Sequence, residues 1–373
     1  MNGNPIECKP NAQNGIRLLR ILYQEEKLTK RELSQRMGMS LPTVQLYLKQ
    51  LADEGFLMES GTAISSGGRK AHTLSLSKNA RIAVGIEITA FHYKLVLINL
   101  RDEVLYNKRI ACAFEDTPHY WKRIAEEAQK FLRTAGFHAE QVLGVGVALP
   151  GIVDKEAQIL RVSTSLHLEN LALNLLADQL PWPILLENDA NAAGLAELGR
   201  IEQLEDAVYI SLSKGVGGAI LINHQVYQGS RFHAGELGHF TLIPGGKPCN
   251  CGGRGCLESY CSALALCDDI RELDQFFYRV RTGNAEANAR LEQYLRHLAL
   301  AIHNLHTIFD TDLILGGDLV PYLENYLAEL YQQVHLLGNS ANTHPFHIRI
   351  SKFLDYSPAV GAAVLVTRQF WQE

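Results

Sequence analysis

Four residues of the types that bind zinc lie close together in the second half of the chain. They are His239, Cys249, Cys251 and Cys256. Three thiolates and one imidazole form a Cys3His set, which proteins use in closed structural zinc sites. Glycines follow Cys251 and precede Cys256, and glycine lets the backbone turn tightly enough for three sulfur atoms to converge on one ion. The sequence therefore predicts a structural Zn²⁺ site.

A group of buried, reduced cysteines beside a chance histidine is the alternative interpretation. Three of the seven cysteines of the chain fall within eight residues with glycines between them, which favours metal binding. A redox pair of the CxxC type is disfavoured, because no two cysteines of this stretch are separated by two residues.

Two carboxylates, Glu236 and Glu258, lie at the two ends of the same stretch. A metal ion that folds the stretch also brings Glu236, His239 and Glu258 together. A zinc site with no open coordination position can in this way build a ligand pocket.

The stretch resembles the signature of the ROK family (repressors, open reading frames and sugar kinases). The resemblance rests on Gly235–His239 followed by Cys249–Glu258, and it extends from about residue 80 to the C-terminus. Three further stretches resemble the sugar-side loop, the catalytic-aspartate loop and the nucleotide-side glycine turn of the family, in that order: Gly144–Asp154, Glu187–Gly194 and Leu313–Leu319.

The resemblance implies a sugar site. The residues that match the sugar-binding positions of the family are Asn188, Asp189, Glu236, His239 and Glu258. Carboxylates and amides make paired hydrogen bonds to adjacent hydroxyl groups. One ring nitrogen of His239 is expected on zinc and the other on a sugar hydroxyl. For Asn188 and Asp189, a helix N-cap after a strand is an alternative role that does not exclude sugar binding.

Kinase activity is a separate question. In ROK kinases the residue that matches Asp189 is the general base, so Asp189 is here a vestigial base candidate. The kinases also carry Asp-x-Gly-Gly-Thr after their first strand. The matching stretch of this chain, Glu87–Phe91, has Thr89 and Ala90 in place of the two glycines and Phe91 in place of the threonine. Phosphoryl transfer depends on positioning the phosphates, so we expect little or no kinase activity. An ATP-dependent sugar kinase with an accessory DNA-binding domain is the alternative.

The first eighty residues predict a helix-turn-helix. Apolar spacing indicates a helix around residues 16–22, and Thr29–Glu32 reads as a capping box for a second helix that ends at Gly38. Ser40 caps a third helix, expected to place Leu41, Val44, Leu48 and Leu51 on one face, with Gly55 closing it.

The third helix is expected to read DNA in the major groove through Ser40, Thr43, Gln45 and Lys49. Strands at 56–59 and 72–76 then predict a wing, with Arg69 and Lys70 reaching the minor groove or the phosphates. The alternatives are a helical hairpin that only mediates dimerisation and, for Arg69 and Lys70, a plain basic linker.

Strands mixed with helices predict an α/β body of two lobes around a cleft. The resemblance implies the two-lobed actin-like ATPase fold with a structural zinc. We expect a winged helix-turn-helix DNA-binding domain at 1–80, a first lobe at 81–188 plus 355–373, and a second lobe at 189–354 that carries the zinc loop and the sugar site.

Composition narrows the class of protein. Residues 1–80 carry 11 Lys and Arg against 7 Asp and Glu, a net of +4, whereas the remainder carries 24 against 33, a net of −9. A basic first domain favours a polyanionic partner. The chain has no signal pattern and no membrane span, so the expected compartment is the cytoplasm.

The expected partners are double-stranded operator DNA and a small sugar or sugar-phosphate effector. The expected assembly is a homodimer or homotetramer, because paired half-sites call for paired proteins. Control by a sugar-transport protein, with the cleft vestigial, is a third hypothesis.

Overall fold

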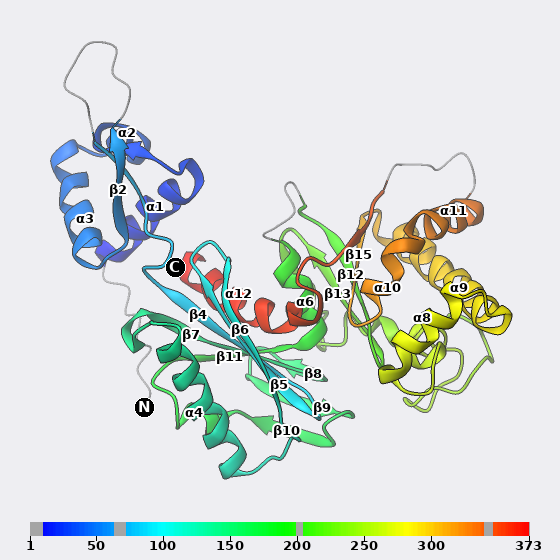
Figure 1. Cartoon of the computed structure of the whole chain (residues 1–373). Helices are drawn as coiled ribbons and strands as arrows, with labels where there is room; N and C mark the ends of the chain where they lie inside the picture. The colour runs from blue at the N-terminus through cyan, green and yellow to red at the C-terminus, as the bar shows by residue number, and fades with distance from the viewer. Residues whose placement is uncertain (1–9, 63–71, 199–203, 339–345, 373) are drawn as a thin grey trace.

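A computed structural model describes residues 10–62, 72–198, 204–338 and 346–372. A small helical domain at the N-terminus is followed by a body with two five-stranded sheets (Figure 1). The small domain contains α1 (Pro10–Glu25), α2 (Lys30–Met37) and α3 (Leu41–Asp53). Its sheet has the antiparallel order β1-β3-β2, made of β1 (Leu28–Thr29), β2 (Leu57–Thr62) and β3 (His72–Leu76).

The predicted helix signals of this domain are confirmed. Thr29 Oγ1 accepts a hydrogen bond from the Glu32 amide at 3.3 Å, and the Glu32 carboxylate accepts one from the Thr29 amide at 2.7 Å. Gly38 ends α2 with a φ of 67°, and Ser40 caps α3 through the Thr43 amide. These short-range bonds set where α2 begins and ends and where α3 begins.

Two details of the domain differ from the prediction. Leu41 is 40% exposed, whereas Val44, Leu48 and Leu51 are buried. As the first residue of α3, Leu41 lies at the edge of the small core, where its side chain stays partly open to solvent. The strand β1 was not predicted, because two residues carry no recognisable pattern. The wing strands β2 and β3 pair as expected, and Arg69 and Lys70 between them lie outside the described residues.

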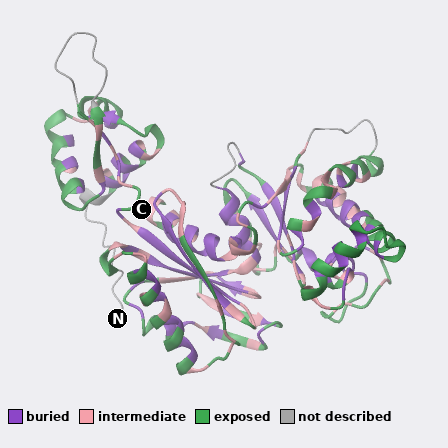
Figure 2. Cartoon of the chain, in the orientation of Figure 1, coloured by how far each residue is buried: buried purple, intermediate pink, exposed green. Residues whose placement is uncertain are grey.

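The first body sheet has the order β11-β7-β4-β5-β6. Helix α4 (Pro118–Thr134) covers one face and α12 (Ser357–Gln372) the other, so its central strands are buried on both sides (Figure 2). The strands are β4 (Ile82–Ile88), β5 (His92–Asn99), β6 (Val104–Ala111), β7 (Val142–Leu149) and β11 (Ile184–Asn188). A smaller sheet of β8 (Ile152–Asp154), β9 (Ile159–Ser163) and β10 (Leu168–Ala172), then α5 (Asn174–Ala177), lies between β7 and β11 in sequence.

The second body sheet has the order β14-β13-β12-β15-β16. One face packs on α6 (Asp189–Leu198) and the other on the long helix α9 (Ala285–Phe309). The strands are β12 (Ala207–Leu212), β13 (Val216–Ile222), β14 (Gln225–Val226), β15 (Asp312–Gly316) and β16 (Ile348–Ile350). The further helices are α7 (Glu258–Cys261), α8 (Leu273–Arg281), α10 (Val320–Leu323) and α11 (Leu327–Leu337).

The last helix joins the parts of the molecule. α12 packs against α6 and against β4 and β7, and small residues make this possible: a side chain at Gly85 would collide with the backbone of Ala359, and one at Gly146 with that of Ala362. At its C-terminal end, Phe370 and Trp371 contact the winged-helix domain. One helix therefore touches both sheets and the N-terminal domain.

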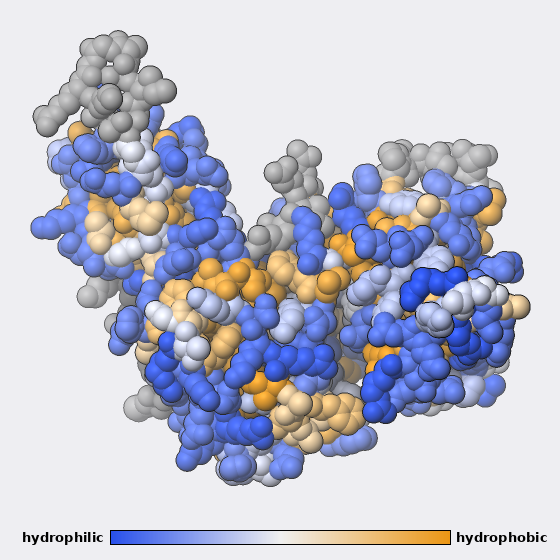
Figure 3. Space-filling model, viewed as in Figure 1, coloured by the Kyte–Doolittle hydropathy of each residue, from blue (hydrophilic) through white to orange (hydrophobic). Residues whose placement is uncertain are grey.

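None of the helices in the described ranges combines the length and the apolar character that crossing a bilayer requires. On the face shown in Figure 3, hydrophilic residues cover most of the surface.

Candidate functional site

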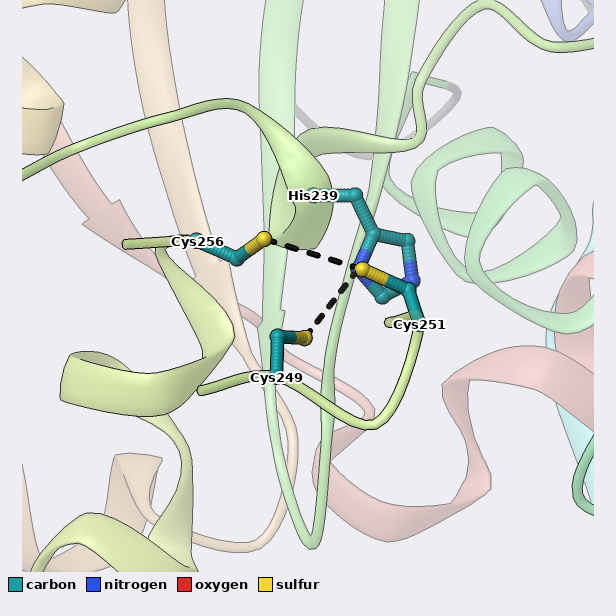
Figure 4. A group of neighbouring side chains, drawn as sticks. All are labelled: His239, Cys249, Cys251 and Cys256. Atoms are coloured by element: carbon teal, nitrogen blue, oxygen red, sulfur yellow. Dashed lines mark hydrogen bonds between the residues drawn. The ribbon is translucent and has the colours of Figure 1, made fainter. Parts of the chain in front are cut away.

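The four predicted metal ligands converge in the structure. One ligand atom from each of His239, Cys249, Cys251 and Cys256 lies within 4.8 Å of the others. Cys249 Sγ is 3.7 Å from His239 Nδ1, and Cys251 Sγ is 3.7 Å from Cys256 Sγ (Figure 4). The donor set could hold a metal ion.

Backbone conformation brings the sulfur atoms together. Gly252 and Gly255 have φ values of 86° and 81°, a region that favours glycine. The amide of Cys249 donates to the carbonyl of Gly253, and the amide of Gly252 donates to the carbonyl of Cys249, both at 3.0 Å. The chain thus folds back between Cys249 and Cys256, as the glycine spacing predicted.

One pair of sulfur atoms in the cluster has the separation that tetrahedral zinc would require. With Zn–S bonds of about 2.3 Å, tetrahedral geometry separates neighbouring sulfur atoms by about 3.7–3.8 Å, and the Cys251 and Cys256 sulfurs lie at 3.7 Å. Burial raises the pKa of the Cys256 thiol to about 12. A thiolate at this position therefore needs a neighbouring cation, which a bound metal would supply.

Glu258 links the candidate metal centre to the second sheet. Its Oε2 accepts a hydrogen bond from the Val216 amide at 3.1 Å, and its Oε1 lies 3.9 Å from Cys249 Sγ. Glu236 lies one turn before His239, whose amide donates to the Glu236 carbonyl at 3.1 Å. His239 and Glu258 thus both lie near Cys249, whereas Glu236 contacts His239 through its backbone carbonyl.

A small pocket that is partly open to solvent lies beside this loop. Asn188 and Glu236 line it, whereas Asp189, His239 and Glu258 are not among its lining residues. The lining residues are Gly151, Val153, Asn188, Asn191, Gly218, Gln228, Phe232, Ala234, Gly235 and Glu236. Of the five predicted sugar-binding residues, Asn188 and Glu236 therefore line the pocket, His239 and Glu258 lie at the metal cluster, and Asp189 begins α6.

Asn188 caps α6, the role that the sequence left as an alternative. Its Oδ1 accepts from the Asn191 amide at 2.9 Å, and its Nδ2 donates to the Gly151 carbonyl at 2.8 Å. Asp189 Oδ1 accepts from the Ala190 amide at 2.8 Å. Withdrawal from water, together with the nearby Glu236 carboxylate, raises the pKa of Asp189 to about 6. A carboxyl group with this pKa can accept and return a proton near neutral pH.

A buried carboxylate beneath the pocket was missed by the sequence analysis. Glu187 is fully buried, and its Oε2 lies 3.1 Å from Lys155 Nζ. Its Oε1 accepts a hydrogen bond from Asn191 Nδ2 at 3.2 Å, and Gln228 Nε2 donates to both carboxylate oxygens at 3.4 and 3.5 Å. Only Glu187 and Asn191 are close in sequence, so no local pattern indicates the whole network.

The end of β4 contains an internal ion pair. Glu87 Oε2 lies 3.1 Å from Lys94 Nζ, both side chains are buried, and Lys94 also contacts Asp355. Burial raises the pKa of Glu87 to about 7, although Lys94 opposes the shift. In the turn after β4, Phe91 is 70% exposed, and Lys214 Nζ from the second sheet lies 5.8 Å from its ring centroid.

The predicted DNA-reading residues of the described part lie on one helix. Thr43, Gln45 and Lys49 are exposed on α3, opposite its buried stripe. Ser40 Oγ and Thr43 Oγ1 lie 2.8 Å apart, so these hydroxyls are already partnered with each other. Leu46, which is 69% exposed on the same helix, was not predicted. An exposed apolar side chain here can contact a thymine methyl group.

Comparison with known proteins agrees with this architecture. The ROK family matches residues 83–369, and a winged helix-turn-helix DNA-binding family matches residues 13–58. The xylose repressor of Bacillus subtilis (strain 168) is 25% identical over 368 residues, which cover 95% of this chain and 94% of the repressor.

Solved structures show the same fold. A ROK family transcriptional regulator described as a homologue of the E. coli MLC protein has a TM-score of 0.77 at 22% identity, with 97% of each chain covered. A ROK hexokinase from Thermus thermophilus has a TM-score of 0.67 at 25% identity; the match covers 78% of this chain and 100% of the hexokinase. The hexokinase likeness is confined to that share of the chain.

Proposed function

The chain belongs to the ROK family, and on that premise we propose that it is a sugar-responsive transcriptional repressor of genes for carbohydrate uptake or catabolism. The observation that carries the proposal is a helix-turn-helix domain joined by α12 to a body that contains a ligand pocket. The name of the Bacillus subtilis relative, a xylose repressor, supports the same function.

In this proposal, separate parts of the molecule bind DNA and the effector. The winged-helix domain at 1–80 binds operator DNA through α3. The lobes at 81–188 plus 355–373 and at 189–354 hold the effector, with Asn188, Asp189, Glu236, His239 and Glu258 as the proposed sugar-binding residues. The separate hydrogen-bonded sheets at 82–188 and 207–350 support these boundaries.

Zinc is the proposed metal of the Cys3His cluster. His239, Cys249, Cys251 and Cys256 would hold it, and when bound it would stabilise the three thiolates and fix the loop. Because this set leaves no open coordination position, its role is structural. The loop then fixes His239 and Glu258 beside Cys249.

Ligand binding changes DNA affinity only if the effector prefers one arrangement of the molecule over another. The pocket is lined by Asn188 and Asn191 at the start of α6, which packs against α12, and the far end of α12 contacts the winged-helix domain. We propose that the effector acts along this route in a homodimer, in which two winged helices meet two half-sites.

A sugar kinase is the second candidate, favoured by the likeness to the hexokinase and by a proton-accepting Asp189. Three features oppose it: the missing glycines after β4, the Lys94 cation already paired with Glu87, and Phe91 in the turn. The proposal therefore includes the absence of kinase activity.

Capture of sheared genomic DNA on the purified protein, followed by sequencing, tests the function. Discrete palindromic sites beside sugar-utilisation genes are the expected result. Diffuse retention that disappears as salt rises contradicts the proposal. ATP-dependent phosphorylation of a sugar, abolished by Asp189→Asn, would instead establish the kinase.

A further inference from the structure

The segment that joins the winged-helix domain to the body is short and hydrogen-bonded. It consists of the five residues 77–81, between β3 and β4 (Figure 1). The Ser77 amide donates to the Phe56 carbonyl at 2.8 Å, and Arg81 Nη1 donates to the Glu54 carbonyl at 3.2 Å. The Arg81 guanidinium also lies 4.4 Å from the centroid of the Phe56 ring. Both ends of this linker are therefore held against the winged-helix domain.

The middle of the linker is held by the body. The Leu100 amide, in the turn between β5 and β6, donates to the Lys78 carbonyl at 3.0 Å. Lys78 Nζ lies 2.8 Å from Glu103 Oε2, and Asn99 Nδ2 donates to Asn79 Oδ1 at 3.0 Å. The linker is thus bonded to both of the parts that it joins.

The turn between β5 and β6 also enters the core of the winged-helix domain. Leu100 is fully buried there, in one hydrophobic cluster with Leu18 of α1. Arg101 Nη2 donates to the Tyr23 carbonyl at 3.1 Å, and its guanidinium lies 4.9 Å from the centroid of the Tyr23 ring. From α12, Trp371 Nε1 donates to the Leu100 carbonyl at 3.3 Å. A side chain of the body therefore completes the core of the DNA-binding domain.

A rotation of the winged-helix domain about the linker would break these contacts together. It would expose the Leu100 side chain to water and separate Arg101 from Tyr23. Segments that open easily have few buried apolar contacts and backbone hydrogen bonds that are exposed to solvent. The junction has the opposite character, because a fully buried leucine and several hydrogen bonds cross it.

We propose that the winged-helix domain and the first lobe form one rigid unit, and that Leu100 and Arg101 are the positioning residues that fix α3 on this unit. The joint that can respond to an effector then lies between the two lobes and not at residues 77–81. An effector that changes the angle between the lobes moves α3 together with the first lobe. Only this last step rests on the proposed function.

Limited trypsin digestion of the full-length protein, followed by mass spectrometry, tests the rigid unit. Lys78 and Arg81 are tryptic sites within the linker, and the exposed Lys122 and Lys130 on α4 are reference sites in the first lobe. Cleavage of a folded segment requires local opening. We therefore expect cleavage at the linker to be no faster than cleavage at α4. Preferential cleavage at Lys78 and Arg81 in the original protein overturns the proposal.

Leu100→Ala is expected to raise the ratio of linker cleavage to α4 cleavage by at least about 10-fold, because it leaves a cavity at the junction. Leu100→Met keeps most of the volume and is expected to restore the original ratio. Leu95→Ala is the matched control: this leucine lies on the same strand and is equally buried, but in the core of the first lobe. General destabilisation raises cleavage at both sets of sites, so the ratio is expected to stay unchanged in Leu95→Ala.

Arg101→Ala keeps the test independent of any folding defect in Leu100→Ala, because Arg101 is only partly buried. The ratio is expected to rise by about 3- to 10-fold, the loss of one hydrogen bond. Arg109→Ala, an exposed arginine on β6, is the control. An unchanged ratio in either Leu100→Ala or Arg101→Ala removes that residue from the positioning role.

The outcomes separate this inference from the proposed function, because neither DNA nor sugar enters the measurement. A linker that is cleaved readily overturns the rigid unit and leaves the repressor standing. Absence of discrete operator sites in the genomic capture overturns the repressor, while a protected linker still establishes the rigid unit.

Discussion

The backbone of Gly361 in α12 lies directly against the backbone carbonyl of Ala192 in α6, so that no side chain fits between them. α6 begins at Asp189, beside the pocket, and α12 ends at the winged-helix domain. We therefore expect a displacement of α6 to move α12 as well, because close-packed interiors transmit displacement.

Gly361→Ala is expected to destabilise the protein by about 1–3 kcal/mol or more, because the added methyl group collides with the Ala192 carbonyl. Thermal or urea unfolding measures the change. Gly338→Ala is the matched control: its φ is −82°, and the nearest atom to an added methyl group is 3.8 Å away. Equal stability of the two variants would mean that α6 and α12 separate readily.

Phe370→Ala is expected to uncouple the DNA-binding domain from the body. Phe370 stacks on Phe56 with ring centroids 6.0 Å apart, and aromatic pairs contribute about 0.5–1.5 kcal/mol beyond area burial. Operator affinity without effector is expected to stay within a few fold, while release by effector weakens. Fluorescence anisotropy with labelled operator, with and without sugar, measures both. Tyr106→Ala on exposed β6 is the control, and an unchanged effector response in Phe370→Ala contradicts the α12 route.

Removal of the metal is expected to unfold the loop between His239 and Cys256. Cys251→Ser lowers zinc content, and the loss of a structural ligand is expected to lower the melting temperature. Metal analysis combined with thermal melting checks this, with Cys112→Ser, a cysteine outside the cluster, as the control. A metal-free protein that melts at the original temperature would show that the cluster is not structural.

Asp189 is expected to make stability fall as pH rises. Its pKa is raised from 3.8 to about 6 in the folded protein, so the folded state binds more protons than the unfolded state between these values. The free energy of unfolding therefore falls between about pH 4 and pH 6, and the loss is complete above about pH 6.

Asp189→Asn is expected to remove this pH dependence and to stabilise the protein above pH 6 by about 1–3 kcal/mol. Urea unfolding from pH 4 to pH 8 measures the difference, with the exposed Asp178→Asn as control. Parallel pH profiles for the original protein and Asp189→Asn would be inconsistent with a raised pKa.

Two exposed residues of α3 are expected to affect DNA binding differently. Gln45→Ala is expected to cost about 1–3 kcal/mol on the cognate site and little on other sequences, as the loss of a base contact does. Lys49→Ala is expected to weaken binding to all sequences and to reduce the salt slope by about 1. Titrations on cognate and scrambled DNA at several salt concentrations separate the two. If Gln45→Ala weakens binding equally on both DNAs, Gln45 does not contact the bases.

Local interactions were predictable from the sequence because the residues that make them are neighbours in the chain. The Thr29–Glu32 capping box, the Ser40 cap and the turn at Gly38 each need only a few consecutive residues. The gathering of His239 with Cys249, Cys251 and Cys256 also followed from spacing, since the glycines between them fix a short loop. These features determine the two helices of the DNA-reading motif and the metal cluster.

The tertiary structure alone decided the contacts between distant segments. Lys155, Glu187 and Gln228 meet only because strand β11 packs beside two segments that are distant in the sequence, and Lys94 meets Asp355 only because the end of the chain returns to the first sheet. The sequence also placed Leu41 in the core, but exposure depends on which neighbours cover a position. Burial and long-range pairing are properties of the packed chain, so no local pattern could have specified them.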